Sequence, residues 1–378
     1  MSLIIDIHAL QTVPPSLINR DDTGAPKTAV FGGVPRQRVS SQSWKRAIRK
    51  YFEDHFDSDQ IGDRSKRLPE KIAKRLEEVA GLEQAEAIER VQKLFKAAKI
   101  STEVEKAQKK TDDPDAAHNP YPHTKYLFFL SPAQVDHAVQ VLGEDWEGKI
   151  SKKDAQSVLD EDHSVDMAMF GRMVADDAAY NVDAAVQVAH ALGVHASAPE
   201  FDFYTAVDDL AEEGEETGAG MLGTVQMMSS TMYRYATVNV DGLAQNLDSP
   251  ATARDAAVKF IEAFVSSMPT GKINTFANQT LPELLYVAVR DTRPVSLVNA
   301  FESPVTGTES DDRRHESARR LADEARNVQD AYGFTPNSSY VLALGDLADA
   351  FDGIAEKVTL AELTDKLQGD LDRAMGDE

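Results

Sequence analysis

The residues best suited to chemistry are the basic side chains between Thr23 and Phe52. This run contains no acidic residue, so no neighbour in the sequence neutralises their charge. The whole chain carries a formal net charge of −23 at pH 7, so a basic run without acids is a local exception. Several cations spread along one surface match the phosphates of a nucleic-acid backbone better than they match one small anion. We therefore expect an anion-binding surface here. Its bases are Lys27, Arg36, Arg38, Lys45, Arg46, Arg49 and Lys50.

The second half of this run predicts a helix whose start suits an anion. Ser40 or Ser41 can cap it, and its first turn, Ser41-Gln42-Ser43, has no carboxylate to compete for the free N–H groups. Lys45 and Arg49 stand four residues apart, on a flank of the apolar stripe. The alternative is a solvated amphipathic helix whose bases pair with acids elsewhere. The apolar stripe, at helical spacing, is Trp44, Ala47, Ile48, Tyr51 and Phe52.

One glycine-rich stretch matches a dinucleotide-binding motif in sequence but not in context. Gly218–Gly223 fits the dinucleotide pattern G-x-G-x-x-G, and Asp241 stands near the distance of a ribose-binding acid. That pattern should follow a strand and open a helix, whereas here it follows an acidic run and precedes a strand. We interpret it as a flexible loop.

No pattern in the sequence builds a catalytic centre. There is no cysteine, no H-E-x-x-H, no G-x-S-x-G and no P-loop. His190 and His195 flank a helix stop, and each is interpreted as an ordinary core or surface residue. Asp112, Asp113 and Asp115 are interpreted as a solvated loop rather than a metal site. We therefore expect no metal and no cofactor.

An aromatic cluster gives a second candidate contact with nucleic acid. Phe201, Phe203 and Tyr204 are close in sequence, and Thr205 follows them. Together with Met173, these aromatic side chains could stack on bases or wedge between them. The alternative is that they belong to the core.

The elements that must position these residues alternate between strands and helices once a charged helical block, about Ser58 to Val165, is set aside. This order favours an α+β sheet of the ferredoxin-like kind, with helices on one face and insertions at its edges. We predict strands at Leu3–Leu10, Val165–Met169, Met228–Val240 and Leu284–Arg290, and helices at 40–52, Pro132–Gly143, Asp183–Leu192, from Ser249 to before Pro269, and near 309–330.

Composition sets outer limits on the function. A chain of 378 residues favours one elaborated domain or two, and a hydrophobic fraction of 42% is enough for a core. Neither a signal peptide nor a membrane span is predicted, so we expect a soluble, cytoplasmic protein. A pI near 4.8 argues against a general nucleic-acid coat but allows one basic stripe. The alternative is that the acidity serves only solubility.

Several blocks, in the same order, resemble the CasC family, the backbone subunits of the type I-E CRISPR Cascade complex. The resemblance covers about 1–52, 164–240 and 270–303, roughly half of the chain. The matching residues are Leu17-Ile18-Asn19-Arg20-Asp21-Asp22, Lys27, Phe31-Gly32-Gly33, the RVSSQSWKRAIRK helix, Gly171-Arg172-Met173, Phe203 to Leu210, Tyr233-Arg234-Tyr235-Ala236 and Asn299-Ala300-Phe301-Glu302.

The resemblance implies an RRM-like palm (1–57, 181–192 and 226–378), a mostly helical finger (58–180) and a thumb (193–225). It also implies a non-catalytic subunit that stacks on copies of itself, six in the family, along a guide RNA. Each thumb would displace one base, and the remaining bases would pair with target DNA. Other Cascade subunits are further partners, and no membrane is involved.

The resemblance also assigns roles to residues. It implies that the RNA backbone is held by Arg20, Lys27, Ser40, Gln42, Lys45 and Arg49. It implies that the displaced base is flanked by Met173 from the finger and by Phe203, Tyr204 and Thr205 at the thumb.

Two other functions stay open at this point. One is a metal-dependent CRISPR RNA-processing ribonuclease with the same fold, which would need a histidine or acid cluster facing the basic helix. The other is a small-molecule enzyme that uses the glycine-rich loop.

Overall fold

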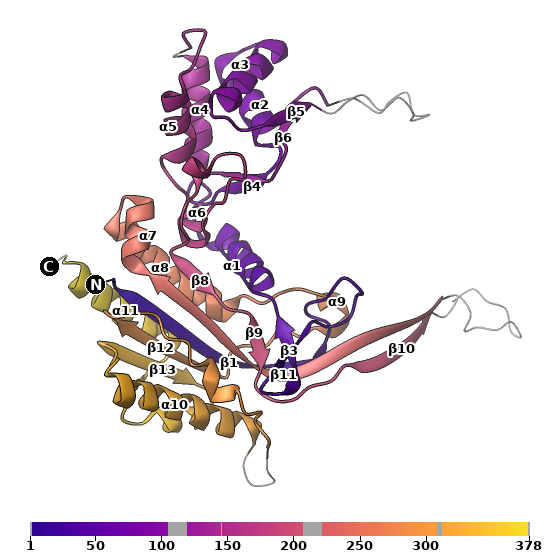
Figure 1. Ribbon diagram of the computed structural model, residues 1–378, viewed down its shortest axis with the longest axis vertical. Helices are drawn as coiled ribbons and strands as arrows, with labels where there is room; N and C mark the ends of the chain where they lie inside the picture. The colour runs from indigo at the N-terminus through magenta and orange to yellow at the C-terminus, as the bar shows by residue number, and fades with distance from the viewer. Residues whose placement is uncertain (1, 105–118, 145, 207–220, 308–311, 377–378) are drawn as a thin grey trace, which may run out of the picture. The chain divides into compact units, whose positions relative to one another are not determined.

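The computed structural model describes residues 2–104, 119–144, 146–206, 221–307 and 312–376 (Figure 1). The chain forms two compact units. The first comprises Met1–Tyr51, Gln187–Val240 and Arg254–Glu378, and the second comprises Phe52–Val186 and Asp241–Ala253. The first contains most of the expected palm and thumb, and the second contains most of the expected finger.

One large sheet organises the first unit. Its order is β14-β13-β12-β1-β11-β9-β3-β2, and both β8 and β10 also pair with β11. The central strand β1 is antiparallel to both of its neighbours, β11 and β12. The strands are β1 (Ile4–Ser16), β2 (Thr28–Phe31), β3 (Val34–Val39), β8 (Val186–Val188), β9 (Ala191–Gly193), β10 (Glu200–Ala206), β11 (Met221–Asn239), β12 (Leu284–Arg290), β13 (Ser338–Ala343) and β14 (Glu356–Lys357).

Helices cover both faces of this sheet, which corrects the expectation of helices on one face. On one face, Leu10, Tyr233 and Tyr286 pack with residues of α10 (Arg313–Tyr332), η2 (Val298–Phe301) and η3 (Leu347–Phe351). On the other, Arg234 lies between the rings of Trp44 in α1 (Ser41–His55) and Phe264 in α8 (Pro250–Ser266). The physical reason is visible in β1, because Ile4 to Leu10 is buried at every position and so needs cover on both sides.

The first unit also contains α9 (Ile273–Phe276) and α11 (Leu360–Met375), whereas α7 (Val240–Leu247) lies almost entirely in the second unit. A capping box at Thr359 starts α11, which buries Leu363, Leu367 and Leu371 along one stripe.

The second unit is mostly helical, as expected for its charged sequence. One apolar cluster joins its helices, with Leu76, Phe95 and Leu142 among its fully buried side chains. Two short two-stranded ribbons, β4 with β7 and β5 with β6, were not predicted. Its elements are β4 (Asp63–Ser65), α2 (Leu68–Ala80), α3 (Gln84–Ala97), β5 (Thr102–Val104), β6 (Pro122–Thr124), β7 (Phe128–Leu130), α4 (Pro132–Gly143), α5 (Lys152–Asp160), α6 (Val165–Phe170) and η1 (Ala178–Tyr180).

Two predicted elements are wrong. The expected strand at Val165–Met169 is α6, a helix too short to show helical periodicity, in which every residue from Val165 to Met169 is buried. The expected helix at Asp183–Leu192 contains β8 and β9 instead. Pairing of β9 with β3 on one side and β11 on the other outweighs the helix preference of its alanines. The predicted strands in β1, β11 and β12 and the predicted helices in α1, α4, α8 and α10 are confirmed.

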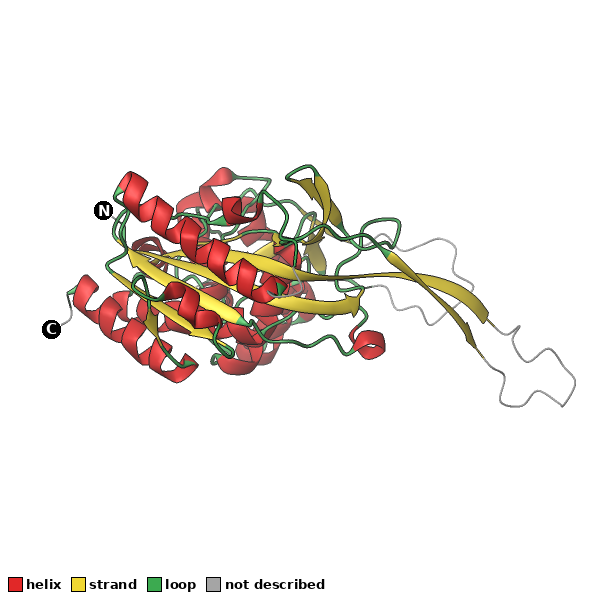
Figure 2. Cartoon of the chain, turned by 90° about the horizontal axis from the view of Figure 1, so that it is seen from below, coloured by secondary structure: helices red, strands yellow, loops and turns green. Residues whose placement is uncertain are grey.

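A long two-stranded ribbon extends from the sheet (Figure 2). The second half of β11 pairs with β1, from Ser16–Met228 to Ile4–Asn239, and its first half pairs with β10 alone. Met221, Leu222 and Gly223 therefore lie in a strand, so the loop interpretation is wrong for them. Gly218–Gly220 and Asp112, Asp113 and Asp115 lie outside the described residues. Within the described ranges, no helix combines the length and the apolar character needed to cross a membrane.

Candidate nucleic-acid interface

The loop from Asn19 to Lys27 gathers the first cations of the expected surface. The Asp21 carboxylate accepts hydrogen bonds from the backbone N–H groups of Thr23 and Ala25, so this acid is used inside the turn. Lys27 N–H donates to the carbonyl of Asn19 at 3.0 Å, and Arg20 forms a β-bridge with Pro26. These bonds close the loop and hold Arg20 and Lys27 near each other.

The same loop is tied to the start of α1. The Ser40 backbone N–H donates to the Asn19 side-chain oxygen at 2.9 Å. The Ser40 hydroxyl accepts from Ser43 N–H at 3.4 Å, a weak version of the predicted cap. Ser40 is buried, whereas Gln42 is exposed on the first turn. The loop and the helix start therefore form one surface.

Four cations of this surface have no ionic partner in the described part of the chain, unlike several cations of the second unit. In the second unit, Lys71, Lys74 and Lys93 pair with Asp63, Glu70 and Glu89. Among the described residues, no acid lies within ion-pair distance of Arg20, Lys27, Arg38 or Arg46. Arg20 and Arg46 are exposed, and Lys27 and Arg38 are half-buried. Their positive charge therefore remains available to a polyanion.

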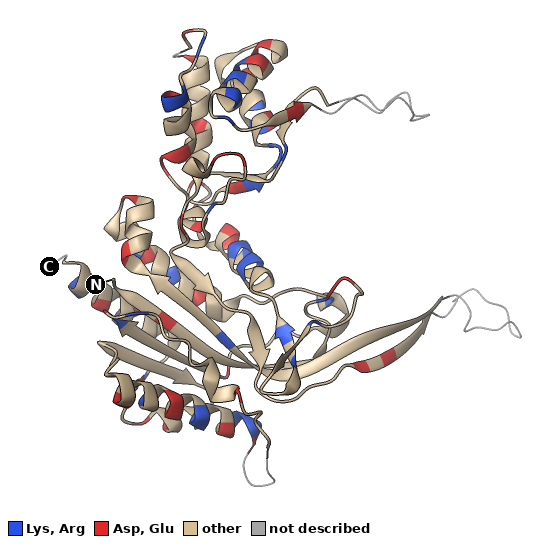
Figure 3. Cartoon of the chain, in the orientation of Figure 1, with Lys and Arg blue, Asp and Glu red and all other residues tan. Residues whose placement is uncertain are grey.

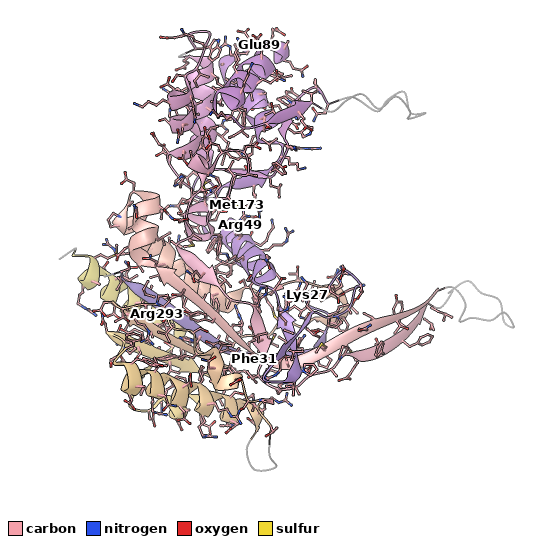
Figure 4. All side chains as sticks on the ribbon, in the orientation of Figure 1. Lys27, Phe31, Arg49, Glu89, Met173 and Arg293 are labelled. Atoms are coloured by element: carbon pink, nitrogen blue, oxygen red, sulfur yellow. The ribbon has the colours of Figure 1, made fainter. Side chains whose placement is uncertain are left out.

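The rest of the basic residues follow α1. Lys45 and Arg49 are half-buried on the helix, and Lys50 is exposed. Burial lowers the pKa of Lys45. Figure 3 shows the concentration of bases on α1, and Figure 4 marks Arg49 on that helix and Lys27 on the loop before β2.

Arg234 anchors this helix to the sheet. Its guanidinium carbon lies 3.7 Å from the centroid of the Trp44 ring and 4.1 Å from that of Phe264. It donates to the Gln11 side-chain oxygen and to the Phe264 carbonyl, both at 2.6 Å. Desolvation lowers the pKa of Arg234 to about 9. The Tyr233-Arg234-Tyr235-Ala236 block thus serves the fold and holds α1 in place.

The structure places Arg36 away from the expected RNA-binding surface. Its side chain is fully buried and donates to the carbonyls of Phe31, Gly193, Phe301 and Glu302 at 2.9–3.2 Å. A guanidinium whose donors are taken up by carbonyls cannot also grip a phosphate. Arg36 therefore fastens the β2–β3 hairpin to the end of η2. This correction also gives the Asn299-Ala300-Phe301-Glu302 block a structural role.

A second loop without acids packs beside this surface. Residues 263–282 contain no Asp or Glu, and their single base, Lys272, is exposed with a positive φ of 53°. A Cβ on Gly271 would lie 2.2 Å from the carbonyl oxygen of Ile18, so this loop touches the segment that leads to Arg20. Sequence analysis missed Lys272, although the lack of acids around it was a usable signal.

The β10–β11 ribbon carries the aromatic cluster on its surface rather than in a core. Phe201 and Phe203 are 69% and 65% exposed, and Thr205 is exposed on the same face. Tyr204 lies on the opposite face, over Gly223, where an added Cβ would come within 2.3 Å of the Tyr204 ring. Phe203 and Tyr204 therefore present two different faces of the ribbon.

Met173 belongs to the second unit and is 82% exposed. Arg172 before it is buried and donates to the carbonyls of Tyr180, Phe129 and Leu159 at 2.8–3.2 Å. Desolvation lowers the pKa of Arg172 to about 10. Arg172 thus fixes the backbone from which Met173 projects.

The histidines and acids that sequence analysis considered do not assemble into a metal site. Within the described residues, no group of three or more His, Asp or Glu side chains could hold a metal ion. Both ring nitrogens of His195 have partners inside the fold: Nδ1 lies 2.8 Å from the Ala196 carbonyl, and Nε2 accepts from Thr231 N–H at 3.2 Å.

The large sheet with helices on both faces defines a class, the mixed α/β proteins, and the exposed cations of this one lie on a loop and at a helix start. The chain matches the family described as CT1975-like protein over residues 5–366. It belongs to this family, which confirms the resemblance to CasC-type, guide-RNA-binding backbone subunits of CRISPR complexes.

Solved structures agree with this assignment. A chain of a structure titled "CRISPR RNA-guided surveillance complex, pre-nicking" is 33% identical with a TM-score of 0.81, and the match covers 97% of this chain and 100% of that chain. A chain of another structure, titled "CRISPR RNA-guided surveillance complex", is 29% identical with a TM-score of 0.72, covering 97% and 99%. No curated protein matches this chain.

Proposed function

We propose that this chain is a non-catalytic backbone subunit of a type I-E Cascade complex that polymerises along a CRISPR guide RNA in the cytoplasm. It holds the phosphates of the RNA and leaves base edges free to pair with target DNA. The observation that carries this proposal is the surface of Arg20, Lys27, Arg38 and Arg46. Their charge is left unneutralised by the described part of an acidic protein.

Phosphate contacts suit a subunit that must accept any guide sequence. Contacts to phosphate and sugar fix the position of a nucleic acid, whereas contacts to base edges read its sequence. The described surface offers cations and the exposed Gln42 at the helix start that the buried Ser40 caps. Such a surface grips a repeating anion without reading its bases.

The proposed palm is RRM-like. Along the chain the order is β1, α1, β9, β11, α8 and β12, and in the sheet the four strands lie in the order β12-β1-β11-β9. This β-α-β-β-α-β sequence supports a ferredoxin-like core to which the other strands are added. The β10–β11 ribbon is the proposed thumb, and the helical second unit is the proposed finger.

The ribbon supports a role in displacing bases. Phe201 and Phe203 present exposed rings on one face, and exposed rings stack on nucleic-acid bases regardless of sequence. Thr205 continues that face toward the ribbon tip. We assign Met173, Phe203, Tyr204 and Thr205 to the surroundings of the displaced base, with Phe203 and Tyr204 acting from different faces of the ribbon.

A charge-reversal experiment tests the phosphate contacts. Lys45→Glu with Arg49→Glu should abolish retention of guide RNA in a gel shift at low salt, while circular dichroism shows a folded protein. Lys149→Glu with Lys153→Glu makes the same change of charge at two exposed positions of the second unit. This control should retain RNA. Wild-type retention by the first variant, equal loss in both, or cleavage of the RNA by the wild-type protein would each refute the proposal.

A further inference from the structure

His190 lies beside Arg38 and the start of α1, although its spacing in the sequence gave it no role. The register of β9 with β3 pairs Leu192 with Arg38 and Ala191 with Val39. Continuing the register by one residue brings His190 opposite Ser40, where β3 gives way to α1. The side chain of His190 is exposed there.

Two donors meet one nitrogen of this imidazole. The Ser41 backbone N–H donates to Nδ1 at 3.2 Å, and Nη1 of Arg38 lies 3.4 Å from the same nitrogen. A ring nitrogen that carries a proton cannot accept from either group. The neutral imidazole must therefore hold its proton on Nε2. Partial burial and the charges of Arg38 and Lys27 lower the pKa of His190, which agrees with a neutral ring.

His190 differs from the other described histidines of the first unit. His8 is buried among tyrosine rings, and His195 bonds inside the fold through both nitrogens. His315 bridges two carboxylates, those of Asp312 and Asp346. Within the described residues, Nε2 of His190 bonds to no protein group, and it is carried on an exposed side chain. The contacts at Nδ1 thus orient the ring, and the N–H group at Nε2 remains as a donor for a ligand.

We propose that Nε2 of His190 donates a hydrogen bond to an oxygen of the bound RNA backbone, either a phosphate oxygen or a ribose hydroxyl. This inference rests on the proposed function. A neutral, oriented donor among cations fixes where the backbone lies without adding to the charge that attracts it. His190 is therefore a positioning residue. It acts through one directed hydrogen bond, whereas Lys27 and Arg38 act through their positive charge.

Two substitutions separate the nitrogens of the ring. His190→Asn keeps an acceptor near the position of Nδ1 and removes the distal donor. His190→Gln reaches the position of Nε2 with an amide N–H and removes the proximal acceptor. His190→Asn should weaken binding of guide RNA about fivefold, the equivalent of about 1 kcal/mol, with an unchanged slope of log K against log salt. His190→Gln should bind more tightly than His190→Asn.

The same titrations on the full-length protein decide between the possible acceptors. If the acceptor is a phosphate oxygen, His190→Asn should weaken binding to RNA and to single-stranded DNA of the same sequence equally. If it is a ribose hydroxyl, only RNA binding should weaken. Nitrogen NMR of the imidazole should show the proton on Nε2 in the free protein.

Several results would overturn this inference. Equal RNA binding by wild type and His190→Asn would do so while leaving the proposed function intact. A lower melting temperature in His190→Asn would show that the ring only caps the helix. A shallower salt slope in His190→Asn would show that the ring acts as a cation. Failure of the wild-type protein itself to bind guide RNA would refute the proposed function and this inference together.

Discussion

Arg36 and Arg46 come from the same basic run, and exchanging each for Met should have opposite consequences. Arg36→Met removes a buried guanidinium that donates to four backbone carbonyls and lies 5.7 Å from the centroid of the Phe31 ring. Leaving buried acceptors without a donor costs about 1–3 kcal/mol for each group, although each carbonyl can keep other bonds. We expect a total loss of about 3–5 kcal/mol in the free energy of unfolding.

For domains of 150–250 residues, each kcal/mol lowers the melting temperature by about 2–4 °C. Arg36→Met should therefore melt about 10 °C lower than wild type in calorimetry, and its salt slope for RNA binding should be unchanged at a temperature where it is folded. Arg46→Met removes an exposed cation. It should melt like wild type but lose affinity and about one unit of salt slope. The structural role given to Arg36 is refuted if the two variants exchange these results.

Two further outcomes follow from the ribbon and from the buried histidine. Tyr204→Ala should change the chemical probing pattern of the displaced base with little effect on affinity for RNA. Gly223→Ala should have the same effect, because its added Cβ displaces the Tyr204 ring. An unchanged probing pattern in both variants would contradict the role of Tyr204. His8 is fully buried, and desolvation lowers its pKa from 6.5 to about 3. Between pH 6.5 and about pH 3, His8 binds a proton in the unfolded chain but not in the folded chain. The contribution of His8 to the free energy of unfolding is therefore fully present above pH 6.5 and is lost as the pH falls. In urea unfolding at pH 7 and pH 5, the loss of stability should be smaller for His8→Asn than for wild type; equal losses would refute this assignment.

Local signals in the sequence located the elements that carry the candidate interface. The cap at Ser40, the apolar stripe containing Trp44 and the lack of acids all lie within about one helix length, so α1 could be predicted without tertiary information. The strands β1 and β12 could also be predicted from the sequence, because short continuous apolar runs are typical of buried strands.

Long-range partners explain what could not be predicted. Arg36 and Arg38 have the same parity in β3, yet the first is buried because carbonyls 157 and 265 residues away surround it. His190 was dismissed because its partner, Ser41, lies 149 residues earlier in the chain. Sequence spacing cannot report contacts that only the closed sheet creates. The opposite faces of Phe203 and Tyr204, in contrast, follow from strand alternation and could have been predicted.

Because β11 runs without a break from the middle of the sheet into the ribbon, the core decides which way the ribbon's rings turn. Pairing with β1 fixes the parity of Met228–Asn239, and that parity continues through Met227 into the partners of Phe201 and Phe203. Inserting a single residue into β11 at this junction would reverse the faces of its ribbon half relative to the core, and β10 would have to follow because paired residues share a face. A change in the length of this stem that keeps its rings on the same faces must therefore come in steps of two residues.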